Sequence, residues 1–325
     1  MLTLPPILSS THVQTVQEIA GRNTTLYSVV ATFIGLIALY LVIKAVYWSY
    51  QGWLLTKYPG YIVPAKSKFA ERACKVIAGL FTSSMIGPVK VIGAENASYG
   101  GRLLILPNHS HHLDFAVCEK ALPISYRQVG TKSEVSGIRA PIGAWANFIA
   151  IDTTGGKAAS KAIAERTVKS YARALTFRSR GRLLVFPQGA LVHSGRIPSD
   201  SKITGSMRTG AIRGAKLAQQ VIDAIKSGDA AALQLVRDVH GSQADVTIAY
   251  YKANPAALNE PLAILPVNIR YGKEHADTDA ITIRSKRGGG ATVVIGAPVL
   301  VSSFSDDPRI ASEQLRVIIE DLRPQ

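Results

Sequence analysis

The stretch Arg102-Leu103-Leu104-Ile105-Leu106-Pro107 is followed directly by Asn108-His109-Ser110-His111-His112-Leu113-Asp114, and together they decide the fold. A short apolar run closed by proline is typical of a buried strand, whose carboxyl end then carries the polar cluster. His109 and Asp114 are spaced H-x4-D, so an imidazole and a carboxylate can meet if a helix begins there. An imidazole held by an anion at one ring nitrogen acts as a general base at the other. No serine or cysteine nucleophile is required if the attacking hydroxyl belongs to a substrate.

The segments around this stretch alternate between strand and helix patterns. We expect strands at 89–92, 102–106, 125–129, 148–151, 182–186, 246–250, 263–271, 280–283 and 292–295. We expect helices at 112–121, 158–178, 209–225 and 307–322, the last capped by Ser305 or Asp306, and a surface helix in an insertion at about 226–243. This alternation predicts an α/β fold with a mixed, mainly parallel sheet flanked by helices.

The N-terminal part contains a long apolar segment. No charged residue occurs from Leu26 to Ile43, and these 18 residues reach the lower limit of a bilayer span. Tyr47, Trp48 and Trp53 follow where an interfacial belt is expected. A signal peptide is disfavoured because the segment starts late and lacks a basic start and a cleavage site. We therefore expect a membrane-associated helical segment, with an interfacial or a buried helix as the alternatives.

A second helix is expected at 69–85, with one apolar and one charged face. Its apolar positions are Phe69, Ala73, Val76, Ile77, Leu80, Phe81 and Ile86. Such a helix packs on a core or lies in a membrane interface, and both remain open. The chain is thus expected to divide into a loose polar tail (1–25), an anchor with an amphipathic helix (26–87) and an α/β domain (88–325).

The net charge of +15, from 37 basic and 22 acidic residues, calls for an acidic partner. Lysines and arginines that follow the apolar segment favour a membrane and place the bulk of the chain in the cytoplasm. Nucleic acid is disfavoured, because no basic stripe interleaved with aromatic residues occurs. The two cysteines, Cys74 and Cys118, provide neither a disulfide framework nor a metal set, as expected in a reducing compartment.

The histidine cluster has a second interpretation. Imidazoles and a carboxylate are good ligands for zinc or iron. The cluster nearly matches the H-x-H-x-D-H pattern of binuclear metallohydrolases, although Leu113-Asp114 is out of step. A metal-dependent hydrolase that uses His109, His111, His112 and Asp114 is therefore the alternative.

Taken as N-H-x4-D, Asn108-His109 to Asp114 resembles the signature of the glycerolipid acyltransferases, the glycerol-3-phosphate and lysophosphatidate acyltransferase superfamily. Further segments resemble the family's other blocks and occur in the family's order. They are Lys132-Ser133-Glu134 with 147–152, Leu183-Leu184-Val185-Phe186-Pro187-Gln188-Gly189-Ala190, 207–211 with 216–218, 265–269 and 295–299.

This resemblance implies transfer of a fatty acyl group from acyl-CoA or acyl-carrier protein to a hydroxyl of a lysophosphatidate-like lipid, without a metal or organic cofactor. His109 is expected to be the general base and Asp114 to orient it, with N–H groups at the Gly189 turn facing the oxyanion. Apart from this resemblance, the basic run from 157 to 180 partly follows helical spacing, which leaves two readings: it docks anionic lipid or an acidic carrier protein, or it is only a solvated face. The residues expected to bind substrate are Asn108, Ser110, Lys132, Pro187, Gln188, Gly189, Ala190 and Arg208.

The sequence departs from the family at positions that contact the acceptor's phosphate. Gln188 stands for a glutamate, Ala190 for a threonine and Thr153-Thr154 for an arginine, and Leu191-Val192-His193 lacks the arginine expected there. Cations at shifted positions are expected to compensate: Lys157, His193, Arg196, Lys202 or Arg208. Two alternatives follow, namely an acceptor without a phosphate (a glycolipid, another lysolipid or a pigment) and a lipid-binding protein without catalysis.

Overall fold

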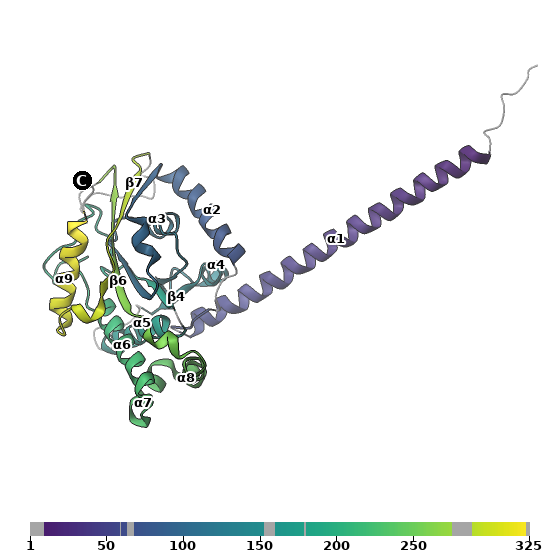
Figure 1. Ribbon diagram of the computed structural model, residues 1–325. Helices are drawn as coiled ribbons and strands as arrows, with labels where there is room; N and C mark the ends of the chain where they lie inside the picture. The colour runs from purple at the N-terminus through teal and green to yellow at the C-terminus, as the bar shows by residue number, and fades with distance from the viewer. Residues whose placement is uncertain are drawn as a thin grey trace, which may run out of the picture. The chain divides into compact units, whose positions relative to one another are not determined.

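The computed structural model describes residues 10–58, 60–63, 68–152, 160–178, 180–274 and 288–322. The chain divides into two units, Met1–Tyr50 and Gln51–Gln325. The first consists of most of α1 (Ser10–Lys57), a single helix of 48 residues (Figure 1). Its part Val30–Lys57 is long and apolar enough to cross a membrane, which confirms the predicted N-terminal apolar helix. The loose tail predicted for 1–25 is wrong from Ser10 onward, because no proline follows Pro6 to interrupt the helix there.

The second unit is built on one sheet. Among the described residues the sheet has eight strands, in the order β1-β7-β6-β2-β5-β3-β4, with β8 paired to β6. All pairs are parallel except β6–β7 and β6–β8, which confirms the predicted mixed, mainly parallel sheet. The strands are β1 (Val89–Ile92), β2 (Arg102–Pro107), β3 (Arg127–Thr131), β4 (Phe148–Ile151), β5 (Arg182–Leu184), β6 (Leu262–Tyr271), β7 (Ala291–Ile295) and β8 (Val299–Leu300).

Strand β2 lies in the middle of the sheet, and all six of its residues are buried. A parallel strand covered on both faces is apolar at nearly every position, which explains the apolar run 103–107 that follows the buried Arg102. Leu104 and Leu106 pack in one core cluster, and Leu103 and Ile105 pack in the other. The sheet therefore separates two hydrophobic layers, both anchored by this strand.

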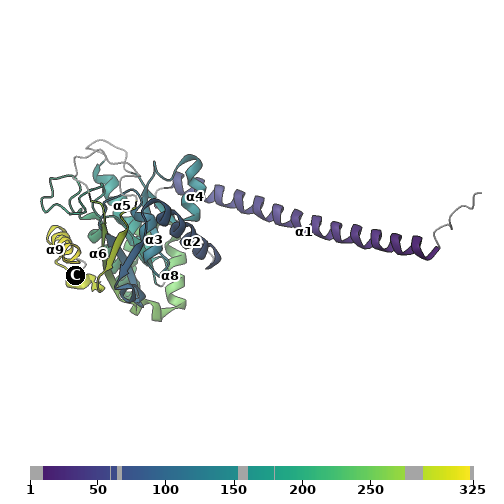
Figure 2. The ribbon, with the colours of Figure 1, turned by 90° about the horizontal axis from the view of Figure 1, so that it is seen from above.

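Helices cover both faces of the sheet. Residues of α5, α6, α7, α8 and α9 pack with Leu104, whereas α3 and the end of α2 pack with Leu103. Figures 1 and 2 show α9 on the face opposite α2 and α3. The helices after α1 are α2 (Lys68–Met85), α3 (Asp114–Ala121), α4 (Ala140–Trp145), α5 (Ser160–Thr176), α6 (Gly210–Ser227), α7 (Ala230–His240), α8 (Ala244–Ala253) and α9 (Pro308–Asp321). The 3-10 turns are η1 (Ala94–Ser98), η2 (Gly137–Arg139), η3 (Gly241–Gln243), η4 (Pro255–Asn259) and η5 (Val301–Ser303).

The strand predicted at 246–250 is wrong, because this segment belongs to α8. Its apolar and β-branched residues suggested a strand, but Ala244, Thr247, Ile248 and Tyr251 are the buried positions. That spacing is one face of a helix, and tertiary packing overrides β-propensity here. The cap of α9 is Asp307 rather than Ser305 or Asp306. The strand predicted at 280–283 lies outside the described residues.

Parallel strands bring the site segments together. Because β2, β5, β3 and β4 run in the same direction, the residues that follow them meet at one edge of the sheet. Residues 108–114 follow β2, 185–193 follow β5, and 132–139 follow β3. We call this the carboxyl edge.

Candidate active site

Asn108, the first residue after β2, fastens the site to the neighbouring strand. Its amide Nδ2 donates to the carbonyl oxygens of Ile269 (3.0 Å) and Gly195 (3.2 Å), and its Oδ1 accepts from the N–H of Ile269 (2.6 Å). The side chain is buried, and these three bonds use its donors and one acceptor. Asn108 therefore holds the end of β2 against β6, and its predicted contact with substrate stays a prediction.

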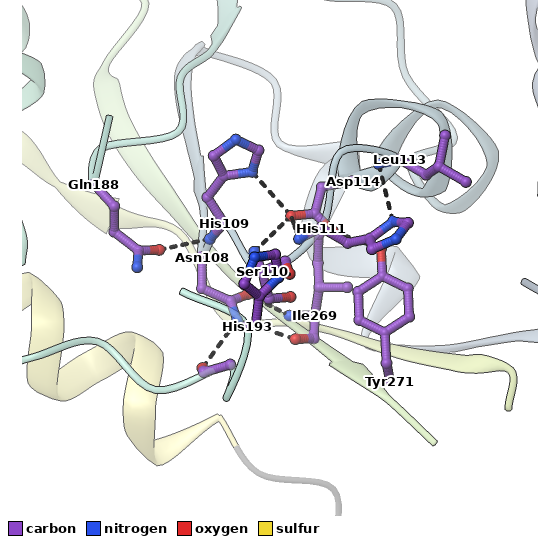
Figure 3. A network of polar contacts seen from close by, with 11 residues as sticks. Asn108, His109, Ser110, His111, Leu113, Asp114, Gln188, His193, Ile269 and Tyr271 are labelled. Atoms are coloured by element: carbon purple, nitrogen blue, oxygen red, sulfur yellow. Dashed lines mark hydrogen bonds and ion pairs between the residues drawn. The ribbon is translucent and has the colours of Figure 1, made fainter. Parts of the chain in front are cut away.

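Asp114 is the first residue of α3 and the centre of the polar network in Figure 3. Its Oδ2 accepts from the N–H groups of Ser110 (2.7 Å) and His111 (2.9 Å) and lies 2.9 Å from Nδ1 of His109. Its Oδ1 accepts from the hydroxyl of Tyr271 (2.5 Å). The carboxyl group is fully buried, so these donors and the helix N-terminus replace water in stabilising the anion.

The contact with Asp114 defines the chemistry of His109. An ionised carboxylate only accepts hydrogen bonds, so Nδ1 of His109 carries the proton and Nε2 keeps its lone pair. The ring stacks on Phe186 with centroids 4.2 Å apart, and 22% of the side chain is exposed. The N–H of His109 donates to Oε1 of Gln188 (2.5 Å), and its carbonyl accepts from Val192 (2.9 Å). The contacts with Asp114 and Phe186 thus fix the orientation of the His109 ring and leave Nε2 as the basic nitrogen.

Tyr271 is a member of the site that the sequence did not predict. It is the last residue of β6, the strand that pairs with β2, and its ring lies 5.5 Å from that of His111. Burial, followed by the charge of Asp114, raises the pKa of Tyr271 well above its usual value. The hydroxyl therefore stays protonated and remains a donor to Asp114.

The other two histidines of the cluster, His111 and His112, differ from His109 in their surroundings. Nδ1 of the buried His111 accepts from the N–H of Leu113 (3.1 Å), whereas His112 is exposed. In the part of the chain that the structure describes, no three His, Cys, Asp or Glu residues gather in a way that holds a metal ion. The geometry therefore gives no support to the metal-dependent hydrolase.

The turn after β5 lies beside His109 and carries a cation. Gly189 has φ 64°, and its N–H donates to the carbonyl of Phe186 (3.2 Å). Arg208 donates from Nε to the carbonyl of Gln188 (3.0 Å) and from its backbone N–H to that of Pro187 (3.1 Å). A Cβ on Gly189 would lie 3.1 Å from Nε of Arg208. Glycine thus accommodates the left-handed backbone and the close approach of the guanidinium.

Of the other residues predicted to bind substrate, Ser110, Ala190 and Gln188 lie close to His109, whereas Lys132 lies at the end of a strand further along the sheet. Ser110 is buried beneath His193, whose Nδ1 contacts its carbonyl oxygen (3.2 Å), and Ala190 is half-buried in the Gly189 turn. Lys132 follows β3 and donates its N–H to Ile151 (2.8 Å), two strands away from β2. Gln188 is buried, with its side-chain oxygen occupied by His109.

Comparison with known proteins assigns part of the chain to a family. Residues 88–225 match the family of proteins described as acyltransferases. The chain carries an acyltransferase domain. The resemblance inferred from the H-x4-D block is thus confirmed for this domain, and the matched residues include His109, Asp114, Gly189 and Arg208.

Among solved structures, the chain matches the crystal structure of the 1-acyl-sn-glycerophosphate (LPA) acyltransferase, PlsC, from Thermotoga maritima. The two sequences are 13% identical, and the alignment covers 87% of this chain and 96% of that one, with a TM-score of 0.43. No curated protein matches the chain.

Proposed function

We propose that this acyltransferase is membrane-associated and moves a fatty acyl group from acyl-CoA or acyl-carrier protein to a hydroxyl of a lysophosphatidate-like lipid. The observation that carries the proposal is the 2.9 Å contact between Nδ1 of His109 and Asp114, which leaves Nε2 as a base. A general base in this state needs only a substrate hydroxyl and a thioester, because the hydroxyl itself is the nucleophile.

The reaction then proceeds in two proton transfers. Nε2 of His109 takes the proton of the acceptor hydroxyl while its oxygen attacks the thioester carbonyl carbon. Asp114 stabilises the imidazolium that forms, since its charge is buried and held by four donors. The tetrahedral intermediate collapses, the C–S bond breaks, and the imidazolium returns the proton to the thiolate.

The oxyanion of the intermediate requires hydrogen-bond donors close to His109. The N–H of Gly189 donates to Phe186 within the turn. We therefore assign the oxyanion to a neighbouring N–H of the same turn, which lies beside His109 through the contact between Gln188 and the His109 backbone.

Arg208 supports a phosphorylated acceptor. Its side chain crosses the Gly189 turn, where it supplies a positive charge in place of the arginine that Leu191-Val192-His193 lacks. The second candidate, an acceptor without phosphate, is favoured by the two missing arginines, because Leu191-Val192-His193 and Thr153-Thr154 stand where the family carries them. Turnover of lysophosphatidate against a neutral monoacyl lipid distinguishes the two, and Arg208→Gln should raise KM about tenfold only for the phosphorylated one.

The apolar helix α1 and the net charge of +15 support a membrane location, with the domain at 88–325 on the cytoplasmic side of the anchor at 26–87. The boundaries and the side stay predictions. Protease protection of a C-terminal tag in inverted vesicles tests the side.

The test of the proposed function is turnover by the full-length chain and by variants of the pair. We expect His109→Ala and Asp114→Asn to lower kcat about a thousandfold, because each removes a working general base, while the fold is retained. Growth rescue of a strain that lacks its lysophosphatidate acyltransferase gives the same comparison in cells.

His112→Ala is the matched control, since His112 is exposed and two residues from Asp114. It should retain normal turnover. Wild-type rates in His109→Ala would refute the base assignment, and a wild-type chain that turns over no thioester would refute the reaction itself.

A further inference from the structure

Two isoleucines are strongly exposed on the short helical element that η2 and α4 form together. Ile138 in η2 is 92% exposed and Ile142 in α4 is 64% exposed. They are four residues apart, so both lie on the same face, while Ala140, Gly143 and Ala144 are buried on the other. Single exposed apolar residues are common, but a pair on one face marks a contact with an apolar partner.

This element packs against the last turns of α1. A Cβ on Gly52 would lie 2.5 Å from the backbone carbon of Ala140, so the two helices touch without room for a side chain. Trp53 and Tyr58 follow, with ring centroids 6.3 Å apart, and Nζ of Lys57 lies 4.3 Å from the ring of Trp53. Exposed tryptophan, tyrosine and lysine together are typical of a membrane–water interface.

The same element belongs to the carboxyl edge, where His109 lies. It follows β3, and the N–H of Lys132 donates to Ile151 at the end of β4 (2.8 Å). The N–H of Gly60 donates to Ala150 (3.1 Å), so the residues after α1 reach this edge too. Figures 1 and 2 show α2 and α4 on the same side of the sheet, and Val76, Ile77, Leu80 and Phe81 of α2 are also exposed.

We propose that Ile138 and Ile142 insert into the lipid bilayer at the boundary between head groups and acyl chains. We call this pair the membrane-contact patch. Trp53, Lys57 and Tyr58 lie at the end of the helix that packs on this element, and their interfacial character favours a bilayer as the partner of the patch. Because the patch belongs to the carboxyl edge, its insertion places the bilayer surface at the same edge of the sheet as His109. A lipid acceptor in that bilayer can then present its hydroxyl to Nε2 of His109. This consequence rests on the proposed function, whereas insertion itself does not.

The test uses the full chain in vesicles of phosphatidylcholine and phosphatidylglycerol, with a polarity-sensitive fluorophore on a single introduced cysteine. Ile142→Cys carries the probe, and the natural Cys74 and Cys118 are buried, so the unsubstituted chain reports background labelling. Spin-labelled lipids should lower the emission about twofold, because an interfacial helix places its apolar side chains among the upper acyl chains.

Ile310→Cys is the matched control, since Ile310 is a similarly exposed isoleucine (54%) on α9. Its probe should stay unquenched. Equal quenching at both positions, or none at Ile142→Cys, would overturn the proposal. A blue shift that depends on protein concentration and not on lipid would overturn it too, because a second copy of the chain would then cover the patch. The readout requires no acyl transfer, so it stands apart from the test of His109.

Discussion

At the scale of single residues, the geometry around Asp114 leads to a prediction about Tyr271. Removing its hydroxyl in Tyr271→Phe deprives a buried anion of one donor, which should lower the unfolding free energy by about 2 kcal/mol. The freed charge of Asp114 then stabilises the imidazolium of His109 more strongly. We expect the acidic limb of the pH profile of kcat/KM to move to higher pH, together with a lower kcat.

Tyr251→Phe is the matched control for this variant. Tyr251 is also buried and donates its hydroxyl to the carbonyl of Thr176 (2.9 Å), on α5 and outside the candidate site. It should lose stability without changing the pH profile. A profile that is identical in wild type and Tyr271→Phe would show that the tyrosine only fills space.

The neutral residue at 188 gives a second prediction at this scale. Gln188→Glu keeps an oxygen for the N–H of His109 and adds a negative charge near the imidazole. The charge should stabilise the imidazolium, so the acidic limb of the same profile moves to higher pH while the fold is kept. The measurement is kcat/KM against pH for both proteins, and a shift to lower pH would contradict it.

The pair His109 and Asp114 was predictable from the sequence because the two residues are close in the chain. His109 lies just after a strand, and Asp114 begins the next helix. Tyr271 was not, because it lies 157 residues from Asp114 in the chain and reaches it only through the pairing of β6 with β2. The bonds of Asn108 to the backbone of Ile269 were not predictable either, because the two residues lie 161 positions apart in the chain. Its contact with substrate stays a prediction.

At the scale of elements, one buried histidine connects three helices. Nε2 of His240, at the end of α7, contacts Oγ1 of Thr176 in α5 (2.9 Å), and Nδ1 contacts Oγ1 of Thr247 in α8 (3.2 Å). The hydroxyl of Thr176 already donates to Ala172 (2.7 Å), so Nε2 carries the proton and Nδ1 accepts. Burial, followed by the charge of Arg173, lowers the pKa of His240 from 6.5 to about 4.

This arrangement predicts a loss of stability in mild acid. Between pH 6.5 and about 4 the unfolded chain binds a proton at His240 and the folded chain does not. The unfolding free energy should therefore fall as the pH drops through this window, by up to about 3 kcal/mol from this residue. Urea unfolding at a series of pH values measures it. His240→Gln should flatten the slope in the window, and an unchanged slope would show that other groups cause the loss.

The elements themselves were predictable where packing and local preference agree. The strands at 89–92 and 148–151 have the predicted bounds, because each is a short run of mostly apolar residues with turn residues beside it. The helix α4 was missed, since Pro141 and Gly143 disfavour a helix interior. Proline is tolerated in the first turn of a helix, and Gly143 packs closely on Val135 and Leu55, so the contacts of the folded chain decide here.

At the scale of the whole molecule, the fold class followed from the alternation of strands and helices, but the order of strands did not. The sheet places β6 beside β2 although about 150 residues separate them, and local patterns contain no information on such a crossover. The apolar segment was different, because length and composition alone decide whether a helix can cross a membrane.

The division into two units predicts how removal of residues 1–50 changes membrane binding. These residues include only Glu18, Arg22 and Lys44 as charged groups, so nearly all of the net charge of +15 stays with the second unit. The core around β2 lies within residues 51–325, and the shortened chain should unfold at nearly the same temperature. We expect the full chain to stay in the membrane pellet in high salt, because burial of the apolar helix does not depend on charge.

The shortened chain should bind vesicles that contain phosphatidylglycerol and leave them in high salt, because the remaining attraction between its basic residues and the anionic lipids is screened there. Flotation of both chains at low and high salt measures the difference. Salt-resistant binding of the shortened chain would mean that the apolar side chains of α2 and the membrane-contact patch hold the domain by themselves. Salt-sensitive binding of the full chain would mean that α1 does not cross the bilayer, since no spanning helix is released by screening.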